Sequence, residues 1–367
     1  MKLVSELTAS RPEFSARLRS LFFLGIAAVM LVDLGRQLAA GQLTYARLVG
    51  YIWNGLVFGL VVGLGGVGLS LTYDLLEFAN FAHGDYITLS AFVGWGTTYL
   101  VAGFGEFSPG SLFFLGVGGT VYPGDLGVSV AGTPLALVVG LVVAALAGAV
   151  LAVVLDRLVY RSMRKTKAIT LLIASVGVAF TLRYLVVYVF SQQAFGLTVS
   201  AWTYNVDFPS GTLNVSAPSL LLVAVTVVTM LAVHLLLTRT KLGKAMRAMA
   251  DNRDLARITG IPSERIITFT WLIGGALAGI AGFMAVLLQG TITYQVGWTL
   301  LLLIFAAVIM GGIGSVYGAV VGGVLIGLIT RVSLVWIPPS FTEAMAFVAM
   351  IAILLTRPQG IFGGGTA

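Results

Sequence analysis

The residues best suited to chemistry lie in one charged segment, residues 239–265, which reads RTKLGKAMRAMADNRDLARITGIPSER. This segment holds seven of the chain's 21 lysines and arginines and is flanked on both sides by apolar runs. Its apolar side chains recur at helical spacing opposite basic ones, which predicts an amphipathic helix that lies on lipid headgroups or docks into a groove of a partner protein. Composition alone slightly favours lipid, although three acidic residues in the segment oppose adsorption to an anionic leaflet.

Catalytic motifs do not occur in this sequence. A phosphate-binding loop requires GxxxxGK[ST], whereas residues 242–245 read LGKA and lack both the upstream glycine and the hydroxyl residue. There is no GxSxG or HExxH motif, no cysteine and only two histidines. We therefore expect no enzymatic activity, no metal and no cofactor, and no ATP hydrolysis by this chain.

Ionisable side chains inside a membrane cost roughly 2.5–3.5 kcal/mol at the midplane on insertion scales and usually mark function. We expect those of this chain to avoid the midplane. Arg183 lies about 22 Å into its predicted helix at 1.5 Å per residue, close enough to the outer surface to snorkel. We expect no buried acid–base pair that could relay a proton or hold sodium, which counts against an ion-coupled carrier.

Composition places these residues in a membrane protein. Hydrophobic residues make up 58% and charged residues 10% of the chain, whereas soluble chains carry about a quarter charged residues. We predict an all-α polytopic membrane protein with about ten transmembrane helices, glycine-rich broken helices and a cytoplasmic loop at 239–265. The net charge of +7 sits in a few loops, which is the positive-inside pattern and no sign of nucleic-acid binding.

The loops set the predicted topology. Residues 102–134 and 191–217 lack lysine and arginine and are expected outside, whereas 156–167 and 239–265 are basic and expected in the cytoplasm together with both termini. The predicted helices lie at about 21–34, 49–72, up to 101, 135–155, 168–190, 218–237, 266–288, up to 310, up to 330, and 340–356. The first could instead be a signal peptide cleaved near LAA at 38–40, and the eighth could be re-entrant.

Several stretches carry motifs beyond their hydrophobicity. They are NFAHGD at 80–85 after WNG at 53–55, LVYR at 158–161 with SVG at 175–177, the charged segment, VIMGGIGS at 308–315, and RPQGIFG at 357–363. In this order they resemble the permease subunits of branched-chain amino-acid ABC importers. The resemblance covers about residues 51 to 363. The extra N-terminal helix, the long loop at 102–134, Met163 in place of a frequent proline and the missing Glu-Ala-Ala triplet of the coupling loop depart from the family pattern.

The resemblance implies two parts: an N-terminal extension with an extra helix (1–48) and a permease domain (49–363). It implies a cell-membrane permease that pairs with a paralogous permease, two cytoplasmic ABC ATPases and an external solute-binding protein. The segment 239–265 would be the coupling loop, with its apolar face in a groove of the ATPase. The residues we assign to coupling are Gly243, Met246, Arg247, Asp251, Ala256, Gly260 and Ile261.

The segment 80–84 is the candidate substrate pathway, because polar groups in a broken stretch between glycine-rich helices can face a cavity. The candidate residues are Asn80, Phe81, His83, Gly84 and, on the preceding helix, Asn54. A structural role, in which Asn80 and Gly84 cap and turn the chain and Phe81 packs beneath, is favoured over pore lining. A tight turn between two helices is expected at Gly311, Gly312, Gly314 and Ser315.

The function expected from the resemblance is import of branched-chain or related amino acids. A permease for urea or short amides remains open, because related permeases share these motifs. An ion-coupled secondary transporter is the rival from a different class.

Overall fold

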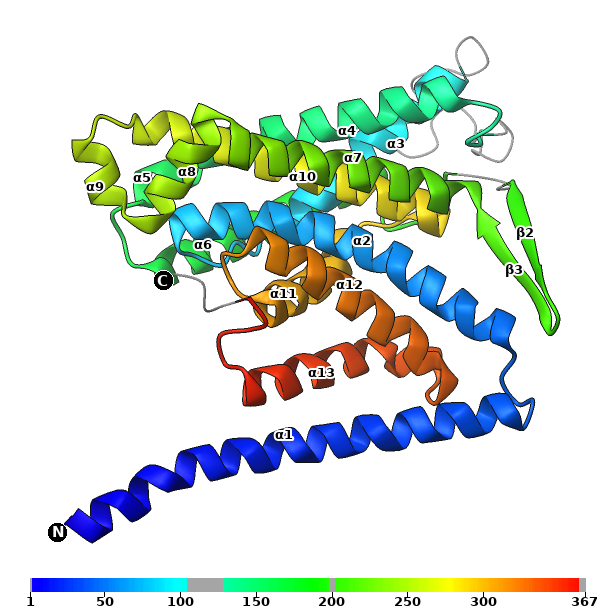
Figure 1. Cartoon of the computed structure of the whole chain (residues 1–367). Coiled ribbons are helices and arrows are strands. Elements are labelled where there is room, and N and C mark those ends of the chain that lie inside the picture. Colours follow the sequence, from blue (N-terminus) through cyan, green and yellow to red (C-terminus); the bar gives the residue numbers. More distant parts are fainter. Residues whose placement is uncertain (1, 104–127, 198–201, 363–367) are drawn as a thin grey trace.

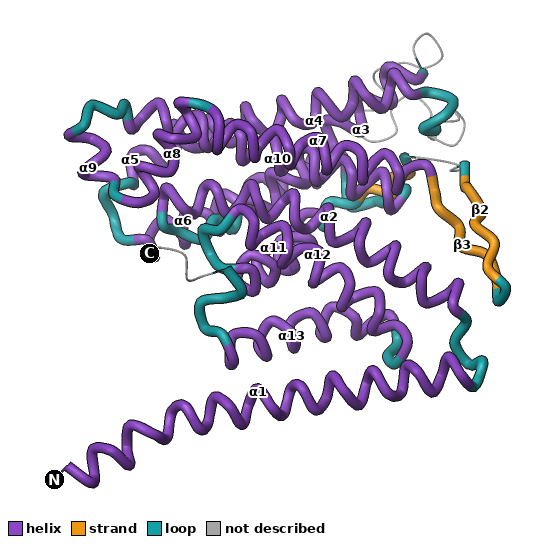
Figure 2. Tube along the Cα trace, in the orientation of Figure 1, coloured by secondary structure: helices purple, strands orange, loops and turns teal. Residues whose placement is uncertain are grey.

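The structure is a computed structural model that describes residues 2–103, 128–197 and 202–362, and side chains from residue 21 onward. The predicted external loop at 102–134 and the last glycine of RPQGIFG fall largely or wholly outside these residues. The described chain is almost entirely helical (Figures 1 and 2). This agrees with the predicted all-α class.

The helices follow one another with short links. They are α1 (Lys2–Ala39), α2 (Tyr45–Leu76), α3 (His83–Ala102), α4 (Pro134–Leu155), the π-helical η2 (Asp156–Tyr160), α5 (Arg161–Met163), α6 (Ala168–Phe190), α7 (Ala217–Arg239), α8 (Lys241–Asp251), α9 (Arg253–Ile258), α10 (Ser263–Gln289), α11 (Val296–Gly311), α12 (Val316–Val332), the 3₁₀ turns η3 (Ser333–Val335) and η4 (Pro339–Phe341), and α13 (Thr342–Thr356). Hydroxyl or amide side chains cap several of them. Thr240 accepts from the amide of Gly243 at the start of α8, and Ser315 from the amide of Gly318 at the start of α12.

Within the described residues, eight helices are long and apolar enough to cross a membrane. Among the ten predicted crossings, α3 and α11 are not in this set, and α11 has only 16 residues. At 1.5 Å per residue it is about 24 Å long, less than the roughly 30 Å of a bilayer core. The crossing of α3 and α11 therefore stays a prediction.

Helix α1 is longer than the predicted apolar run and continues through Ala39. Its described part is hardly buried, and it lies apart from the bundle for most of its length in Figure 1. Near its end, Asp33 accepts a hydrogen bond of 2.9 Å from the indole of Trp336. This contact attaches α1 to the segment after α12.

Short strands were missed by the sequence analysis, which expected an irregular loop at 191–217. Strands β2 (Thr203–Phe208) and β3 (Gly211–Ser216) form an antiparallel hairpin. Strands β1 (Phe195–Gly196) and β4 (Thr291–Ile292) pair two further links. The hairpin lies at one end of the bundle and α8 and α9 lie at the other, where α1 begins and α13 ends (Figure 1).

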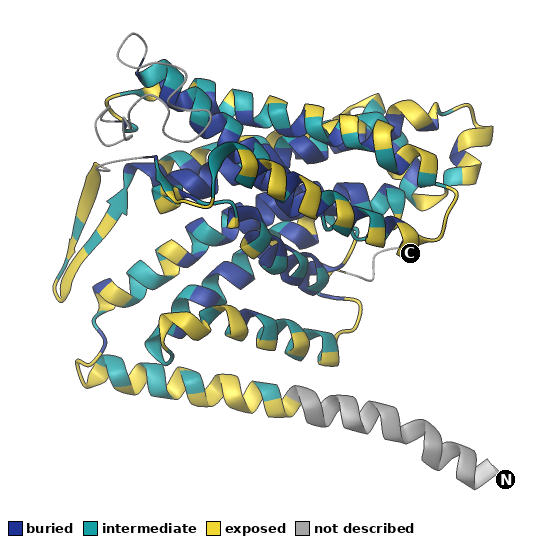
Figure 3. Cartoon of the chain, turned by 180° about the vertical axis from the view of Figure 1, so that it is seen from behind, coloured by how far each residue is buried: buried dark blue, intermediate teal, exposed yellow. Residues whose placement is uncertain are grey.

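Glycines bring the central helices into backbone contact. A Cβ built on Gly59 of α2 would lie 2.7 Å from the carbonyl oxygen of Gly323 on α12, and one on Gly68 would lie 2.8 Å from that of Gly274 on α10. Helices packed this closely gain van der Waals contact where lipid offers no hydrophobic driving force. Buried residues accordingly gather along α2, α3, α10 and α11, and exposed ones along α1 and the periphery (Figure 3).

We expect Gly297→Ala, at the start of α11, to destabilise the fold. The added methyl group would overlap the carbonyl of Gly84 and the hydroxyl of Thr88, which accepts the amide hydrogen of Gly297 at 3.0 Å. Overpacking of this kind costs about 1–3 kcal/mol. Thermal unfolding in detergent measures it, with Gly177→Ala as the control because a Cβ there meets no atom within 4 Å. Equal midpoints for the two variants would contradict the packing described here.

Candidate functional site

The break between α2 and α3 forms the first part of the site. Glu77, which ends α2, has φ 53°, a left-handed conformation that non-glycine residues seldom adopt. The Asn80 side-chain oxygen accepts from the amide of Ala82 at 3.1 Å and from the hydroxyl of Tyr160 at 3.3 Å. The amide of Phe81 donates to the hydroxyl of Ser175 at 3.0 Å. The break is therefore held by side chains of η2 and α6.

His83 and Gly84 lie inside the helix packing. His83 Nε2 lies 3.0 Å from the carbonyl oxygen of Gly65, and because that oxygen only accepts, Nε2 carries the proton. A Cβ on Gly84 would lie 2.7 Å from the carbonyl oxygen of Gly297. Asn80 and His83 are each 1% exposed. In this conformation these two predicted pathway residues do not contact solvent.

Asn54 is not brought near the other pathway candidates. It is exposed in the early part of α2, and 22 residues separate it from the end of that helix, which corresponds to about 33 Å. The amide nitrogen of Asn80, in contrast, is buried and has no partner among the described residues.

The expectation that charges avoid the membrane interior is wrong for one pair. Asp85, in the first turn of α3, is 1% exposed, and both its carboxylate oxygens accept from the guanidinium of Arg183 at 3.1 Å. Arg183 therefore does not snorkel. Its guanidinium also lies 4.5 Å from the ring centre of Trp298 on α11. The sequence carried a signal for this pair, because the two apolar helices contain charges of opposite sign.

A second buried network joins the two basic loops. Arg164, 9% exposed, donates to both oxygens of Asp156 and, through its other nitrogen, to the carboxylate of Glu264. Arg161 also contacts Glu264, at 3.3 Å. The loop after α4 is thus attached to the start of α10. This network too contradicts the expected absence of buried acid–base pairs.

The expectation that the apolar face of the charged segment is free for a partner is also wrong. Gly243, Met246 and Met249 all face inward on α8, and the side chains of the two methionines are 2% and 3% exposed. A Cβ on Gly243 would overlap the backbone of α7 at Leu236 and Leu237. Periodicity identified the buried face correctly, but this face packs against the chain itself.

The exposed apolar residues of the charged segment lie on α9. Leu255 is 55% exposed and Ile258 is 82% exposed, one turn apart, whereas Ala256 between them is buried. Gly260, with φ +88°, ends this short helix, and the amide of Ile261 donates to the carbonyl of Ala256 at 3.1 Å. We call the exposed surface around Leu255 and Ile258 the α9 surface.

Charged side chains surround the α9 surface. Arg247, Asp251, Asp254 and Arg257 are exposed. Arg253 is partly buried, and burial together with the nearby Arg257 lowers its pKa, although an arginine remains charged at any physiological pH. The α9 surface is therefore a small apolar patch bordered by charges of both signs, as is common at the edges of protein–protein contacts.

The predicted turn region joins α11 to α12. Gly312 and Gly314 have φ of 111° and 83°, values that favour glycine. The C-terminal segment is attached here, because the amide of Ile361 donates to the carbonyl of Met310 and that of Phe362 to Gly311, both at 2.9 Å. These contacts form one wall of a cavity.

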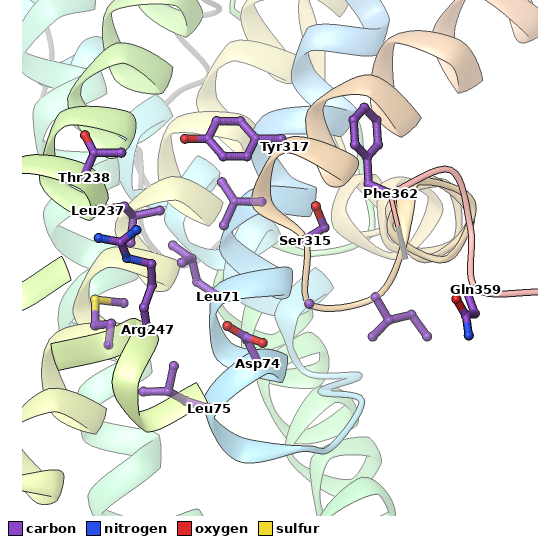
Figure 4. A pocket seen from close by; sticks show the side chains of 14 residues that line it. Leu71, Asp74, Leu75, Leu237, Thr238, Arg247, Ser315, Tyr317, Gln359 and Phe362 are labelled. Carbon is purple, nitrogen blue, oxygen red and sulfur yellow. The ribbon is translucent and has the colours of Figure 1, made fainter. Parts of the chain in front are cut away.

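This cavity has a volume of about 760 Å³ and lies between the last turns of α2, the α7–α8 junction and the α11–α12 turn. Its lining combines leucines with Asp74, Arg247, Ser315 and Gln359 (Figure 4). We call it the α2–α8 cavity. Sequence analysis assigned no role to Asp74, since a lone aspartate near the end of an apolar helix has no motif.

Comparison with known proteins gives consistent results. The sequence model of the family described as "Branched-chain amino acid transport system / permease component" matches residues 51–354. The chain is 26% identical over 317 residues to the high-affinity branched-chain amino acid transport system permease protein LivH of Escherichia coli, covering 85% of this chain and 94% of the relative. It is 26% identical over 314 residues to BraD of Pseudomonas aeruginosa, a protein with the same description, covering 84% of this chain and 94% of BraD. It is 28% identical over 354 residues to a probable LivH of Methanocaldococcus jannaschii, covering 91% of this chain and 95% of that relative.

Proposed function

Because the chain belongs to the branched-chain amino acid transport system permease family, we propose that it is the membrane-spanning permease subunit of an ATP-driven importer for branched-chain or related amino acids. The observation that carries this proposal is the family match over residues 51–354, which spans nearly all of the helical bundle. The chain itself forms the pathway, and ATP is hydrolysed on separate cytoplasmic subunits.

The partners proposed are two cytoplasmic ABC ATPases, a paralogous permease and an external solute-binding protein. The α9 surface supports the first of these. Leu255 and Ile258 are exposed, at one end of the bundle, beside the basic loop 156–167. A partner of the α9 surface would bury apolar area and pair with charges already at its rim. Coupling by Gly243 and Met246 would then be indirect, since they fix α8 to the bundle.

The orientation proposed places α8, α9 and both chain ends in the cytoplasm of a cell-membrane protein. The five basic residues of 156–167 and the seven of 239–265 support this side by the positive-inside rule. Residues 1–48 form the proposed extension, and 49–363 the permease domain.

The substrate pathway proposed passes the break at residues 80–84. It would have to open from the conformation described, because Asn80 and His83 are buried. Lipid-shielded, non-helical backbone beside an unpartnered amide nitrogen supports a pathway that a conformational change exposes.

Two rivals are separated by one uptake assay. Vesicles containing the complex, the binding protein and internal ATP are given labelled leucine with excess unlabelled valine, serine or urea. Competition by valine is expected, and competition by urea alone would favour a urea or short-amide permease. Uptake that requires a sodium or proton gradient and no ATP would favour a secondary transporter, for which Asp85–Arg183 removes the objection that the membrane holds no buried acid–base pair.

A further inference from the structure

The α2–α8 cavity carries two opposite charges that nothing in the described protein neutralises. Asp74 of α2 is half-buried and Arg247 of α8 is exposed at the rim, and the two lie on adjoining walls (Figure 4). Within the described residues, neither side chain has a hydrogen-bond or ion-pair partner. Charged groups that are partly removed from water are usually paired. A carboxylate and a guanidinium left free on one cavity indicate a ligand with both charges.

Apolar side chains surround these two charges. Leu71 and Leu75 precede and follow Asp74 on the same face of α2, and both are buried. Leu237 and Phe362 add apolar surface from α7 and from the C-terminal segment. The volume of about 760 Å³ lies within the range of small-molecule sites. The lining thus offers an anion, a cation and a branched hydrocarbon surface.

We propose that the α2–α8 cavity binds an α-amino acid with an apolar side chain as its zwitterion. The ammonium group binds Asp74, the carboxylate binds Arg247, and the side chain packs against Leu71 and Leu75. This inference rests on the proposed function, because it places a product-side site for the transported class of molecule at the cytoplasmic end of the permease.

A ligand in this cavity contacts α2 and α8 together. It therefore favours the arrangement in which these helices have the present separation, and it biases the transport cycle only through its different affinity for other states. Imported amino acid that accumulates inside then slows further uptake. The site would act as a product sensor on the helix that leads into the α9 surface.

A phospholipid is the competing occupant. An apolar cavity of about 350 Å³ between α7 and α12 shares Leu237, Val316 and Tyr317 with the α2–α8 cavity. An acyl chain could lie there while a phosphoethanolamine headgroup meets the two charges. The leucines beside Asp74 favour the amino acid, because they give the branched side chain a contact next to its own ammonium group.

The test is equilibrium binding of radiolabelled leucine to the purified permease–ATPase complex without the binding protein. Asp74→Asn and Arg247→Gln are each expected to weaken binding about tenfold or more, since a hydrogen bond to a charged group contributes about 1.5–3 kcal/mol. Asp207→Asn and Arg157→Gln make the same changes at exposed positions outside the cavity and should leave binding unchanged. Isoamylamine, which lacks the carboxylate, and 4-methylpentanoate, which lacks the ammonium group, should not compete.

Three results would overturn the inference: no leucine binding, binding unaffected by both cavity variants, or phosphatidylethanolamine that co-purifies with the complex and is lost from both. Import of external leucine by the same preparation, with the binding protein added, separates the two proposals. A complex that imports leucine but gives one of these results refutes the cavity site alone. A complex that imports no branched-chain amino acid refutes the proposed function.

Discussion

Ile258→Asp is expected to abolish ATP-driven uptake while the permease remains folded and inserted in the membrane. Ile258 is 82% exposed on α9, so the folded chain loses almost no packing when it is replaced. In a complex, the same side chain would be buried against the ATPase, where burying an isoleucine contributes about 1.5–3 kcal/mol. An aspartate there loses that contribution and adds a desolvated charge.

Co-purification of the ATPase with tagged permease measures this effect, with at least a tenfold loss expected for a change of about 1.4 kcal/mol or more. Tyr204→Asp is the control, since Tyr204 is 58% exposed on the hairpin at the opposite end of the bundle. Met246→Asp should behave differently, because Met246 is buried and a charge there unfolds α8 from α7. An ATPase that co-purifies equally with wild-type and Ile258→Asp permease would exclude the α9 surface as the docking site.

Arg183→Met is expected to destabilise the membrane domain severely. It leaves the carboxylate of Asp85, 1% exposed, without its guanidinium partner. Removing one member of a buried ion pair costs about 3–5 kcal/mol, because an uncompensated buried charge remains. Heat-induced loss of monodisperse protein in detergent measures the change.

The double variant Asp85→Asn with Arg183→Met separates charge from packing. Replacing both members of a buried pair is often close to neutral, so the double variant should recover most of the lost stability. Its uptake then shows whether the pair serves transport or only the fold. A single Arg183→Met variant as stable as the wild type would contradict the buried pair.

The helical class and most helix positions could be predicted because they depend on local composition. Residues 168–190 were predicted to form a helix with the same bounds as α6. The same helix shows the limit, because sequence places Arg183 along α6 but does not reveal that Asp85 of α3 lies beside it. Contacts between distant helices depend on packing that one sequence does not display.

The charged segment shows the same limit at the site. Helical spacing of Gly243, Met246 and Met249 predicted one inward face, and that face is buried. Periodicity reports that a face is covered but not what covers it, so the covering helix α7 was taken for a partner protein. The apolar pair Leu255 and Ile258, three residues apart, was the available sign of a second, outward face.

The central claim is that this chain is a permease driven by an ATPase docked at the α9 surface. Its most direct test is leucine uptake into proteoliposomes that contain the permease pair and the ATPases, with the binding protein outside and ATP sealed inside. The account predicts accumulation that requires ATP and binding protein, and that falls to background with Ile258→Asp. Accumulation by this chain alone, or driven by an ion gradient without ATP, would contradict it.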